Sequence, residues 1–347
     1  MGKESEVAKA MLSFQERITI PAMGVSSNFI NDVVAQDPRV VCYLSGLSAS
    51  AAFVGMSPQF VINAQYKNKD IPLSDIHIIE SELEMHSLLC QSIGNYKNRI
   101  IILSKSDTNI EAAYQRFMVA NAAFYANFIG AKISKSMTSM TSFYIYNFDF
   151  SYRIGKVKLA MMENETTNEV KRIATKFFLA VMPEEAKIYL AHNYLASTIK
   201  YTLKPDASNL ERSYIQSAYG ALIRKQCVCQ GFAEAFKRLM DEAGVDCDVV
   251  CGQVVGSREY HAWNIVKLKN GAGNYHIDVT WDSNQPRLIY DYFGKTDAFF
   301  EGKRIWNRQY TVHCGSSSDL LRQARRYIVL NKGMLLSNGI PLTVLDM

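Results

Sequence analysis

Three residues that lie far apart in the sequence have the side chains needed for nucleophilic catalysis by a thiol. Cys229 opens a stretch with the apolar spacing of a helix, while His261 and Asp278 lie in segments typical of strands. A cysteine becomes a nucleophile when its thiolate is stabilised and when a nearby base is held in place by a third group. We therefore predict a triad with Cys229 as nucleophile, His261 as base and Asp278 as orienting acid.

The helix expected over residues 229–243 would place the thiol at its first turn. Apolar residues recur along one face of this stretch, and Gly244 follows it as a typical C-terminal residue. The unpaired N–H groups and the positive end of the helix dipole would stabilise a thiolate there. Gly231 is expected to leave room for a substrate backbone beside the thiol.

His261 and Asp278 must meet across a hairpin whose turn is predicted at Asn270-Gly271. With a two-residue loop, His261 lies opposite Thr280, and Asp278 lies one diagonal step away on the same sheet face. A three-residue loop would move Asp278 to the opposite face. The triad therefore requires an even loop between the two strands. Asp282 is the alternative acid on the second strand.

Three motifs occur in a fixed order: VCQGFAEAF at 228–236, HAWN at 261–264 and YHIDVTWD at 275–282. Together they resemble the core of bacterial transglutaminase-like cysteine proteins, over roughly residues 184–297. The family's nucleophile, base and acid fall on Cys229, His261 and Asp278. The resemblance implies an α+β, papain-like core in which the nucleophile helix packs on an antiparallel sheet. It also implies cysteine-dependent acyl transfer on protein or peptide amides through a Cys229 thioester.

Other residues of these motifs are candidates for supporting roles. The backbone N–H of Cys229 and the side chain of Gln226 are expected as oxyanion donors. Gly231 and Trp263 are candidates for substrate binding. Phe232 stands where the family usually has Tyr, and Cys227 is an additional thiol close to the nucleophile. The acceptor of the acyl group, an amine or water, decides between a transglutaminase, a deamidase and a peptidase, and the triad is the same in each case.

Two hypotheses of other classes stay open at this point. A non-catalytic protein-binding module could retain the same fold. A zinc-stapled domain could use four cysteines, but the CxC and CxxxC spacings differ from those of common zinc ribbons. We therefore predict no metal and no cofactor. The four cysteines are Cys227, Cys229, Cys247 and Cys251.

Composition argues against several other classes of protein. Among 347 residues the net charge is only +5, and the basic residues form no long run, so we expect no nucleic-acid partner. No apolar run approaches the ~20 residues that span a bilayer, so no membrane partner is expected. The N-terminus has no apolar signal-like segment, which predicts a cytoplasmic protein as the chain stands. A secreted or surface location would follow if a signal segment had been removed.

The chain is expected to divide into three parts. Residues 1–160 would form an α/β domain, with a strand at 40–44 and a long helix at 110–129. Residues 161–312 would form the transglutaminase-like core, with a helix beginning at the capping box of Thr166. Residues 313–347 would be a β-hairpin tail with turns at 331–333 and 338–339. The expected partner of the core is a protein or peptide carrying a glutamine or another amide.

Overall fold

The computed structural model divides into two compact units, which are described separately. The first contains residues 1–115 and 129–151, and the second contains residues 116–128 and 152–347. The structure describes residues 2–105, 110–121, 127–138, 140, 142–204, 206–257, 259–269, 273–283, 285–308, 311–315 and 319–345.

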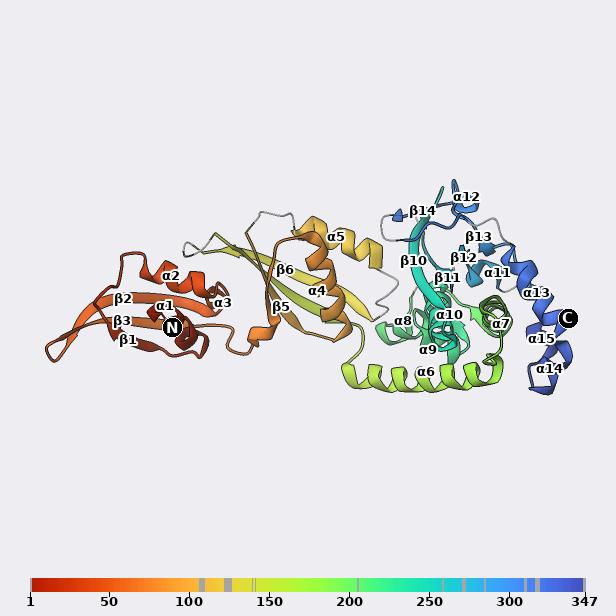
Figure 1. Ribbon diagram of the computed structural model, residues 1–347, viewed down its shortest axis with the longest axis horizontal. Coiled ribbons are helices and arrows are strands. Elements are labelled where there is room, and N and C mark those ends of the chain that lie inside the picture. Colours follow the sequence, from red (N-terminus) through yellow and green to blue (C-terminus); the bar gives the residue numbers. More distant parts are fainter. Residues whose placement is uncertain are drawn as a thin grey trace. The chain divides into compact units, whose positions relative to one another are not determined.

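The N-terminal part of the first unit is an antiparallel sheet with helices packed beside it (Figure 1). The strand order is β1-β3-β2, with β1 (Arg17–Pro21), β2 (Leu44–Val54) and β3 (Ser57–Tyr66). The helices are α1 (Lys3–Leu12), α2 (Phe29–Gln36) and α3 (Val40–Tyr43). The strand predicted at 40–44 is wrong, because these residues form α3 and only Leu44 begins β2. A short, fully buried apolar run does not distinguish the two structures.

A second sheet of the first unit has the order β4-β5-β7-β6. Its strands are β4 (Ile76–Ile79), β5 (Arg99–Ser104), β6 (Phe128–Met137) and β7 (Tyr144–Tyr152), and η1 (Leu73–Asp75) precedes them. Helix α4 (Glu82–Gly94) connects the parallel pair β4 and β5. Helix α5 (Ile110–Asn121) is shorter than the helix predicted at 110–129. Residues 122–126 lie outside the described residues, and Phe128 already belongs to β6.

The second unit opens with a long helix that begins earlier than predicted. Helix α6 (Lys156–Phe177) starts after Gly155, so the capping box predicted at Thr166 is wrong. Thr166 lies inside the helix, where its hydroxyl donates to the Met162 carbonyl at 2.7 Å. Further elements then lead to the candidate nucleophile: α7 (Glu184–Thr198), β8 (Lys200–Tyr201), α8 (Asn209–Ile215), α9 (Ala218–Leu222), β9 (Gln226–Cys227) and α10 (Cys229–Ala243).

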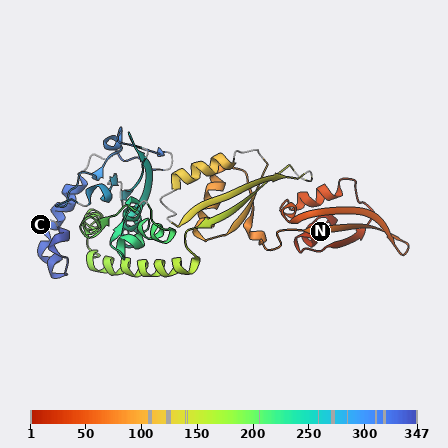
Figure 2. The same ribbon diagram turned by 180° about the vertical axis from the view of Figure 1, so that it is seen from behind.

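An antiparallel sheet of order β13-β12-β11-β10-β14 supports α10, which packs on β10 and β11 (Figure 2). Its strands are β10 (Asp246–Val254), β11 (Tyr260–Leu268), β12 (Gly273–Ile277), β13 (Phe293–Lys295) and β14 (Arg304–Trp306), with α11 (Val279–Asp282) and α12 (Asp297–Phe300) between them. Leu268 pairs with Gly273 and Lys267 with Asn274, which is the register of an even loop. The turn residues 270–272 themselves lie outside the described residues. A helix on an antiparallel sheet agrees with the α+β core expected from the sequence.

The C-terminal segment is helical, so the predicted β-hairpin tail is wrong. It forms α13 (Leu320–Leu330), α14 (Lys332–Ser337) and α15 (Leu342–Leu345). Leu320, Ala324 and Ile328 recur every fourth residue and are buried in the core of the second unit. Asn331 ends α13, and Gly339 has a φ of 79°. Asn and Gly occur at helix ends as well as in hairpin turns, which explains the error.

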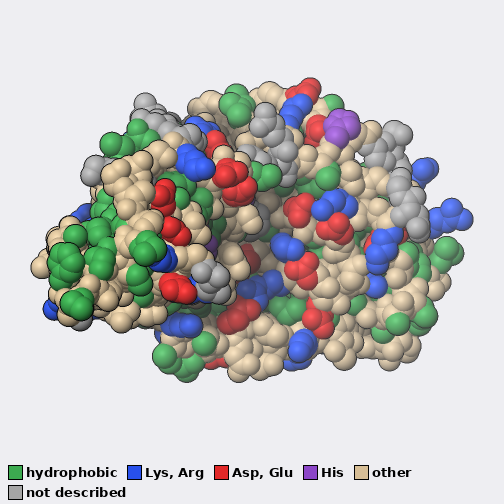
Figure 3. Space-filling model, turned by 60° about the vertical axis from the view of Figure 1, so that its left-hand side comes forward, with side chains coloured by type: hydrophobic (Ala, Val, Ile, Leu, Met, Phe, Trp, Pro, Cys, Tyr) green, Lys and Arg blue, Asp and Glu red, His purple; other side chains and the backbone are tan. Residues whose placement is uncertain are grey.

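Among the described residues, none of the helices combines the length and the apolar character needed to cross a bilayer. On the face drawn in Figure 3, acidic and basic side chains are mixed rather than gathered into areas of one sign.

Candidate active site

The predicted nucleophile lies where the sequence placed it, at the first residue of α10. Val228 is the N-cap and supplies no capping side chain, and Gly244 ends the helix with a φ of 74°. The helix is amphipathic and buries Phe232, Phe236 and Leu239 against the sheet and α7. The Cys229 side chain itself is only partly buried and packs against Ala233 and Ala262. A thiol in this position lies at the positive end of the helix dipole and keeps part of its surface exposed.

His261 lies at the beginning of β11, in contact with both of its predicted partners. Its Nε2 hydrogen bonds to Asp278 Oδ2 at 2.8 Å. It also forms a hydrogen bond with the Cys229 thiol, and the backbone N–H of Ala262 donates to the same sulfur. Because Nε2 is engaged by the carboxylate, Nδ1 is the ring nitrogen left for Cys229. The structure thus brings the three predicted triad residues together in the predicted order.

Asp278 reaches His261 from a different element than expected. Strand β12 ends at Ile277, so the prediction that Asp278 and Asp282 lie on this strand is wrong. Asp278 is instead the N-cap of α11, and its Oδ1 accepts the Trp281 N–H at 3.2 Å. Its parity along the chain still places it on the same sheet face as His261, as the even register requires. One carboxylate oxygen therefore holds the helix end and the other holds the imidazole.

The pKa values of the triad shift in the directions that a thiolate–imidazolium pair requires. Burial alone would raise the pKa of Cys229, but the hydrogen bond and charge of His261 bring it below its ordinary value. Burial alone would lower the pKa of His261, but the charge and hydrogen bond of Asp278 raise it to about 9. Burial would raise the pKa of Asp278, yet the charges of His261 and Arg304 lower it to about 2.

Asn264 links the nucleophile helix to the sheet, and Gly252 leaves room for the Trp263 ring. Asn264, buried on β11, donates from Nδ2 to the carbonyls of Ala233 on α10 at 3.0 Å and of Asp248 on β10 at 3.3 Å. Gly252 lies opposite His261, and a Cβ there would come within 2.8 Å of the Trp263 ring. From the sequence, Asn264 was only a member of the HAWN motif with no predicted role, and Gly252 was not predicted to matter.

Trp263 supports the base instead of lining the substrate site. Its side chain is fully buried and stacks on the His261 ring, with centroids 6.0 Å apart and planes at 14°. Its indole Nε1 donates to His276 Nδ1 at 2.9 Å. A residue enclosed in this way cannot contact a substrate, so the expectation of substrate binding by Trp263 is wrong. It instead packs against the His261 ring from the interior.

Gly231 and Cys227, both close to the thiol, have structural roles that differ from those expected from the sequence. A Cβ on Gly231 would lie 2.6 Å from the Cys227 Cβ and 2.9 Å from the Ser217 carbonyl oxygen. Gly231 is therefore required for packing against Cys227, not for access by a substrate. Burial, with the nearby Cys229 charge, raises the pKa of Cys227 well above its ordinary value. The second thiol is thus a core residue and not a competing nucleophile.

Gln226, the side chain predicted as an oxyanion donor, lies three residues before Cys229 in the sequence. Gln226 is half-buried on β9, which pairs in parallel with β8. Its role as an oxyanion donor stays a prediction. Tyr201, the β8 residue opposite Cys227, was not considered from the sequence. Burial and then the charge of Cys229 raise the pKa of Tyr201, so its phenol lies within electrostatic range of the nucleophile.

Asp282 does not compete with Asp278 for the base. Its Oδ2 lies 3.1 Å from His192 Nε2, and its Oδ1 accepts the Tyr292 N–H at 3.0 Å. Both members of this second pair are fully buried. The alternative acid considered from the sequence is thus occupied elsewhere.

One group of described residues has the composition of a metal site, and it differs from the four cysteines considered from the sequence. Ligand atoms of His276, Asp297 and Cys314 lie within 4.8 Å of one another. However, Trp263 donates to His276 Nδ1, and an indole N–H can only donate. His276 must therefore carry its proton on Nε2, which it donates to Asp297 Oδ1 at 2.8 Å. In that tautomer Nε2 carries a proton and cannot bind a metal, so the three residues form a hydrogen-bond network.

A buried arginine beside the triad was missed from the sequence. Arg304 on β14 forms an ion pair through Nη2 with Asp278 Oδ2, the same oxygen that binds His261. The side chains of Arg304 and Asp278 are both fully buried. Its motif, Lys303-Arg304-Ile305-Trp306, looks like an exposed basic turn, and only its pairing to β10 turns the guanidinium inward.

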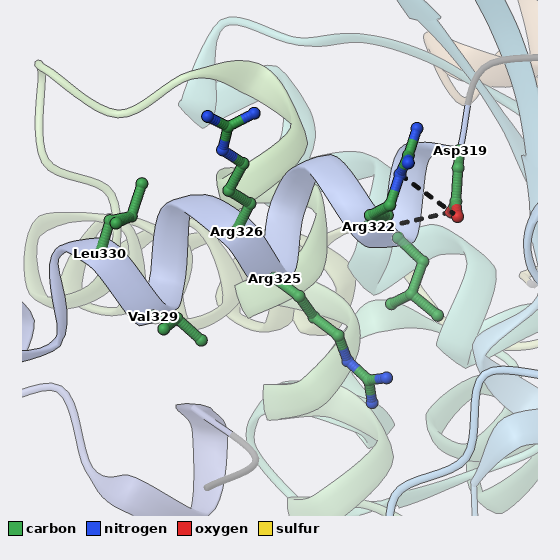
Figure 4. A pocket seen from close by; sticks show the side chains of 7 residues that line it. Asp319, Arg322, Arg325, Arg326, Val329 and Leu330 are labelled. Carbon is green, nitrogen blue, oxygen red and sulfur yellow. Dashed lines mark hydrogen bonds and ion pairs between the residues drawn. The ribbon is translucent and has the colours of Figure 1, made fainter.

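A hollow at the surface of α13 lies apart from this chemistry. It is lined by Asp319, Leu321, Arg322, Arg325, Arg326, Val329 and Leu330 (Figure 4). Asp319 accepts the Arg322 N–H and forms an ion pair with its guanidinium. None of the triad residues lines this hollow, and its side chains offer no nucleophile.

Comparisons with known proteins found similar solved structures and one matching family. Three solved structures are similar to the chain at low TM-scores. A candidate cysteine protease from Cytophaga hutchinsonii has 13% identity and a TM-score of 0.28, over 43% of this chain and 62% of that one. A TGase has 14% identity and a TM-score of 0.29, over 73% and 68%. A candidate protease from Parabacteroides distasonis has 7% identity and a TM-score of 0.26, over 65% and 49%.

The chain thus spans about three fifths of the length of the Cytophaga protein. No curated protein sequence matches the chain. Residues 171–279 match the family described as the transglutaminase-like superfamily, and this range includes Cys229, His261 and Asp278. Residues 171–279 therefore form a transglutaminase-like domain.

Proposed function

We propose that the protein transfers acyl groups from protein or peptide amides through a thioester on Cys229. The observation that carries the proposal is the contact of His261 with both the Cys229 thiol and the Asp278 carboxylate. A thiol with a lowered pKa, partly open to solvent and paired with an oriented imidazole, is the arrangement of a cysteine nucleophile.

The first half-reaction would consume the amide. His261 holds the proton of the Cys229 thiol, and the thiolate sulfur attacks the amide carbonyl carbon. The oxygen becomes an oxyanion, for which the backbone N–H of Cys229 and Gln226 are the proposed donors. The carbon–nitrogen bond then breaks while His261 gives its proton to the leaving nitrogen. A glutamine side chain would release ammonia, a peptide bond would release an amine, and the acyl group would remain as a thioester.

The second half-reaction would regenerate the enzyme. An amine or a water molecule loses a proton to His261 and attacks the thioester carbon. The carbon–sulfur bond breaks, and Cys229 returns to the thiolate paired with the protonated imidazole. Asp278 would keep the imidazole oriented and stabilise its charged form in both halves. The triad serves an amine acceptor and a water acceptor equally, so the acceptor defines whether the protein is a transglutaminase, a deamidase or a peptidase.

The test is an assay of the full chain on a glutamine-containing peptide, with and without a primary amine. Ammonia release measures the first half-reaction, and incorporation of the amine into the peptide separates aminolysis from hydrolysis. Cleaved peptide would identify a peptidase. Cys229→Ala, which retains the helix, is the matched control. Absence of all three products with a range of peptides, together with binding of those peptides, would favour the non-catalytic binding module instead.

A further inference from the structure

Arg304 and Asp278 form a pair of opposite charges in the interior of the second unit. Both side chains have no exposed surface, and the Arg304 Nη2 contacts the carboxylate oxygen that also accepts His261 Nε2. An ionised carboxylate without a partner is costly to bury, and a nearby cation offsets much of that cost. Asp278 thus has a charge partner that does not depend on whether His261 is protonated.

An aromatic enclosure holds the guanidinium. The central carbon of the Arg304 guanidinium lies 4.4 Å from the Trp281 ring centroid, 4.6 Å from that of Phe300 and 4.8 Å from that of Trp263. Tyr292 adds a fourth ring at 5.5 Å. None of its three guanidinium nitrogens makes a hydrogen bond of ordinary geometry to a described residue. The enclosure therefore holds a charge in place rather than a set of directed hydrogen bonds.

We propose that Arg304 is a positioning residue that keeps Asp278 ionised and directed at His261 while the imidazole gains and loses its proton. This role rests on the proposed function of the triad. When His261 is neutral, Arg304 alone balances the buried carboxylate. When His261 is charged, Arg304 shares the carboxylate oxygen with it and limits how tightly the imidazolium is held. His261 can then still give its proton to a leaving group.

The titratable and charged groups around this pair come from several elements. They are Cys229 at the start of α10, His261 on β11, His276 on β12, Asp282 on α11, Tyr292 before β13, Asp297 beside His276, and Arg308, whose charge acts on His276. Burial raises the pKa of Tyr292 and the charge of Arg304 lowers it, and the pKa stays above its ordinary value because burial has the larger effect. Arg304 is the group in contact with Asp278 whose positive charge is independent of pH. Its removal should therefore be seen at acidic pH, where Asp278 takes up a proton.

The test measures the rate at which limiting iodoacetamide alkylates Cys229 across the acidic and neutral pH range. In Arg304→Gln, the acid limb of this profile should move to higher pH by about 1–3 units, since an adjacent opposite charge lowers a carboxyl pKa by that much. Arg304→Lys keeps the charge and should leave the limb near its wild-type position. Arg308→Gln is the matched control, because Arg308 is half-exposed and pairs with Glu301.

A merely structural role would lower the amount of folded protein without moving the limb. In an Asp278→Asn background, Arg304→Gln should cause no further shift, because the group it acts on is gone. If Arg304→Gln alone fails to fold, the double variant should recover folded protein, since no unpaired buried carboxylate remains. A folded Arg304→Gln with the wild-type limb, an equal shift in the Asp278→Asn background, or a double variant no better folded would overturn the proposal.

Alkylation requires no amide substrate, so the two proposals can fail separately. A shifted limb in a protein without turnover would leave the role of Arg304 intact and remove the acyl-transfer proposal. Turnover on amides, together with an acid limb that does not move in Arg304→Gln, would support the acyl-transfer proposal and remove the role of Arg304.

Discussion

Two buried histidine–aspartate pairs lie in the second unit, and only one of them is arranged for chemistry. His261 and Asp278 are 2.8 Å apart, and His192 and Asp282 are 3.1 Å apart. The second ring nitrogen of His261 is left for a thiol. That of His192 donates to the Asn193 Oδ1 at 3.1 Å. Under the proposed function, the same two side chains thus serve as an oriented base in one place and as a structural link in the other.

The carboxylates of the two pairs differ even more than the histidines. Burial would raise the pKa of both, but His261 and Arg304 bring that of Asp278 to about 2. Asp282 has no arginine beside it among its described partners, and its pKa stays above its ordinary value because burial dominates. A histidine–aspartate contact therefore does not identify a catalytic pair. The charge next to the carboxylate and the atom next to the imidazole distinguish the two.

The largest difference between the pairs should appear when each carboxylate is replaced by an amide. Asp278→Asn should lower turnover on an amide substrate by about 10⁴-fold, as in the comparable serine triad, because the imidazole loses its tautomer and its countercharge. Asp282→Asn should leave the rate per folded molecule within a few-fold of wild type. Steady-state rates normalised to titrated Cys229 make the comparison. Equal losses in the two variants would remove the distinction between the pairs.

Replacement of the base should have a somewhat smaller effect. His261→Ala should reduce turnover by about 10²–10⁴-fold, the usual contribution of one general base, while the circular dichroism stays that of a folded protein. His192→Gln, which retains a polar side chain next to Asn193, is the control at the other pair. A folded His261→Ala variant with full activity would exclude His261 as the base.

Selectivity between thiols tests the environment of the first pair. Cys229 should be alkylated about 10²-fold faster than Cys227 at neutral pH, because only Cys229 has a lowered pKa and partial exposure. Mass mapping after limiting iodoacetamide measures both sites in one sample. Labelling of Cys227 while Cys229 remains unmodified would contradict the assignment of the nucleophile.

The smallest effect concerns stability in acid. The folded pKa of Asp278 is lowered, so its contribution is present above its ordinary value of 3.8 and is lost as the pH falls toward about 2. That contribution is at most about 2 kcal/mol. The pKa of Asp282 is raised, so wild type should gain stability relative to Asp282→Asn as the pH falls, and lose it relative to Asp278→Asn. Denaturant titrations at several acidic pH values give both differences, and the same sign in the two variants would refute the contrast.

The parts of the site that the sequence predicted rest on local signals. The helix of the nucleophile follows from its apolar spacing and from Gly244, and both were confirmed. The even register between β11 and β12 is the one that the triad and the turn predicted at Asn270-Gly271 required, and it was also found. These features depend on neighbours within one or two elements, where spacing determines which side chains share a face.

The parts that the sequence missed depend on contacts between distant elements. Arg304 reaches Asp278 only because β14 pairs with β10, and nothing in its own segment indicates burial. Gly231 was assigned to substrate access, but its close neighbour is Cys227, which lies in the preceding strand. The helices of the C-terminal segment were mistaken for a hairpin, since their Asn and Gly residues serve equally well at helix ends. Tertiary packing decides such cases, and a single sequence does not display it.

The most direct test of the account is to look for the acyl-enzyme itself. The full chain is mixed with a glutamine-containing peptide, quenched in acid and digested, and the peptide carrying Cys229 is examined by mass spectrometry. The account predicts a mass increase equal to the acyl peptide less the lost ammonia, located on Cys229 and removed by hydroxylamine. It should be absent in Cys229→Ala. An acyl group on another residue, or turnover of the amide by the Cys229→Ala variant, would contradict the central claim.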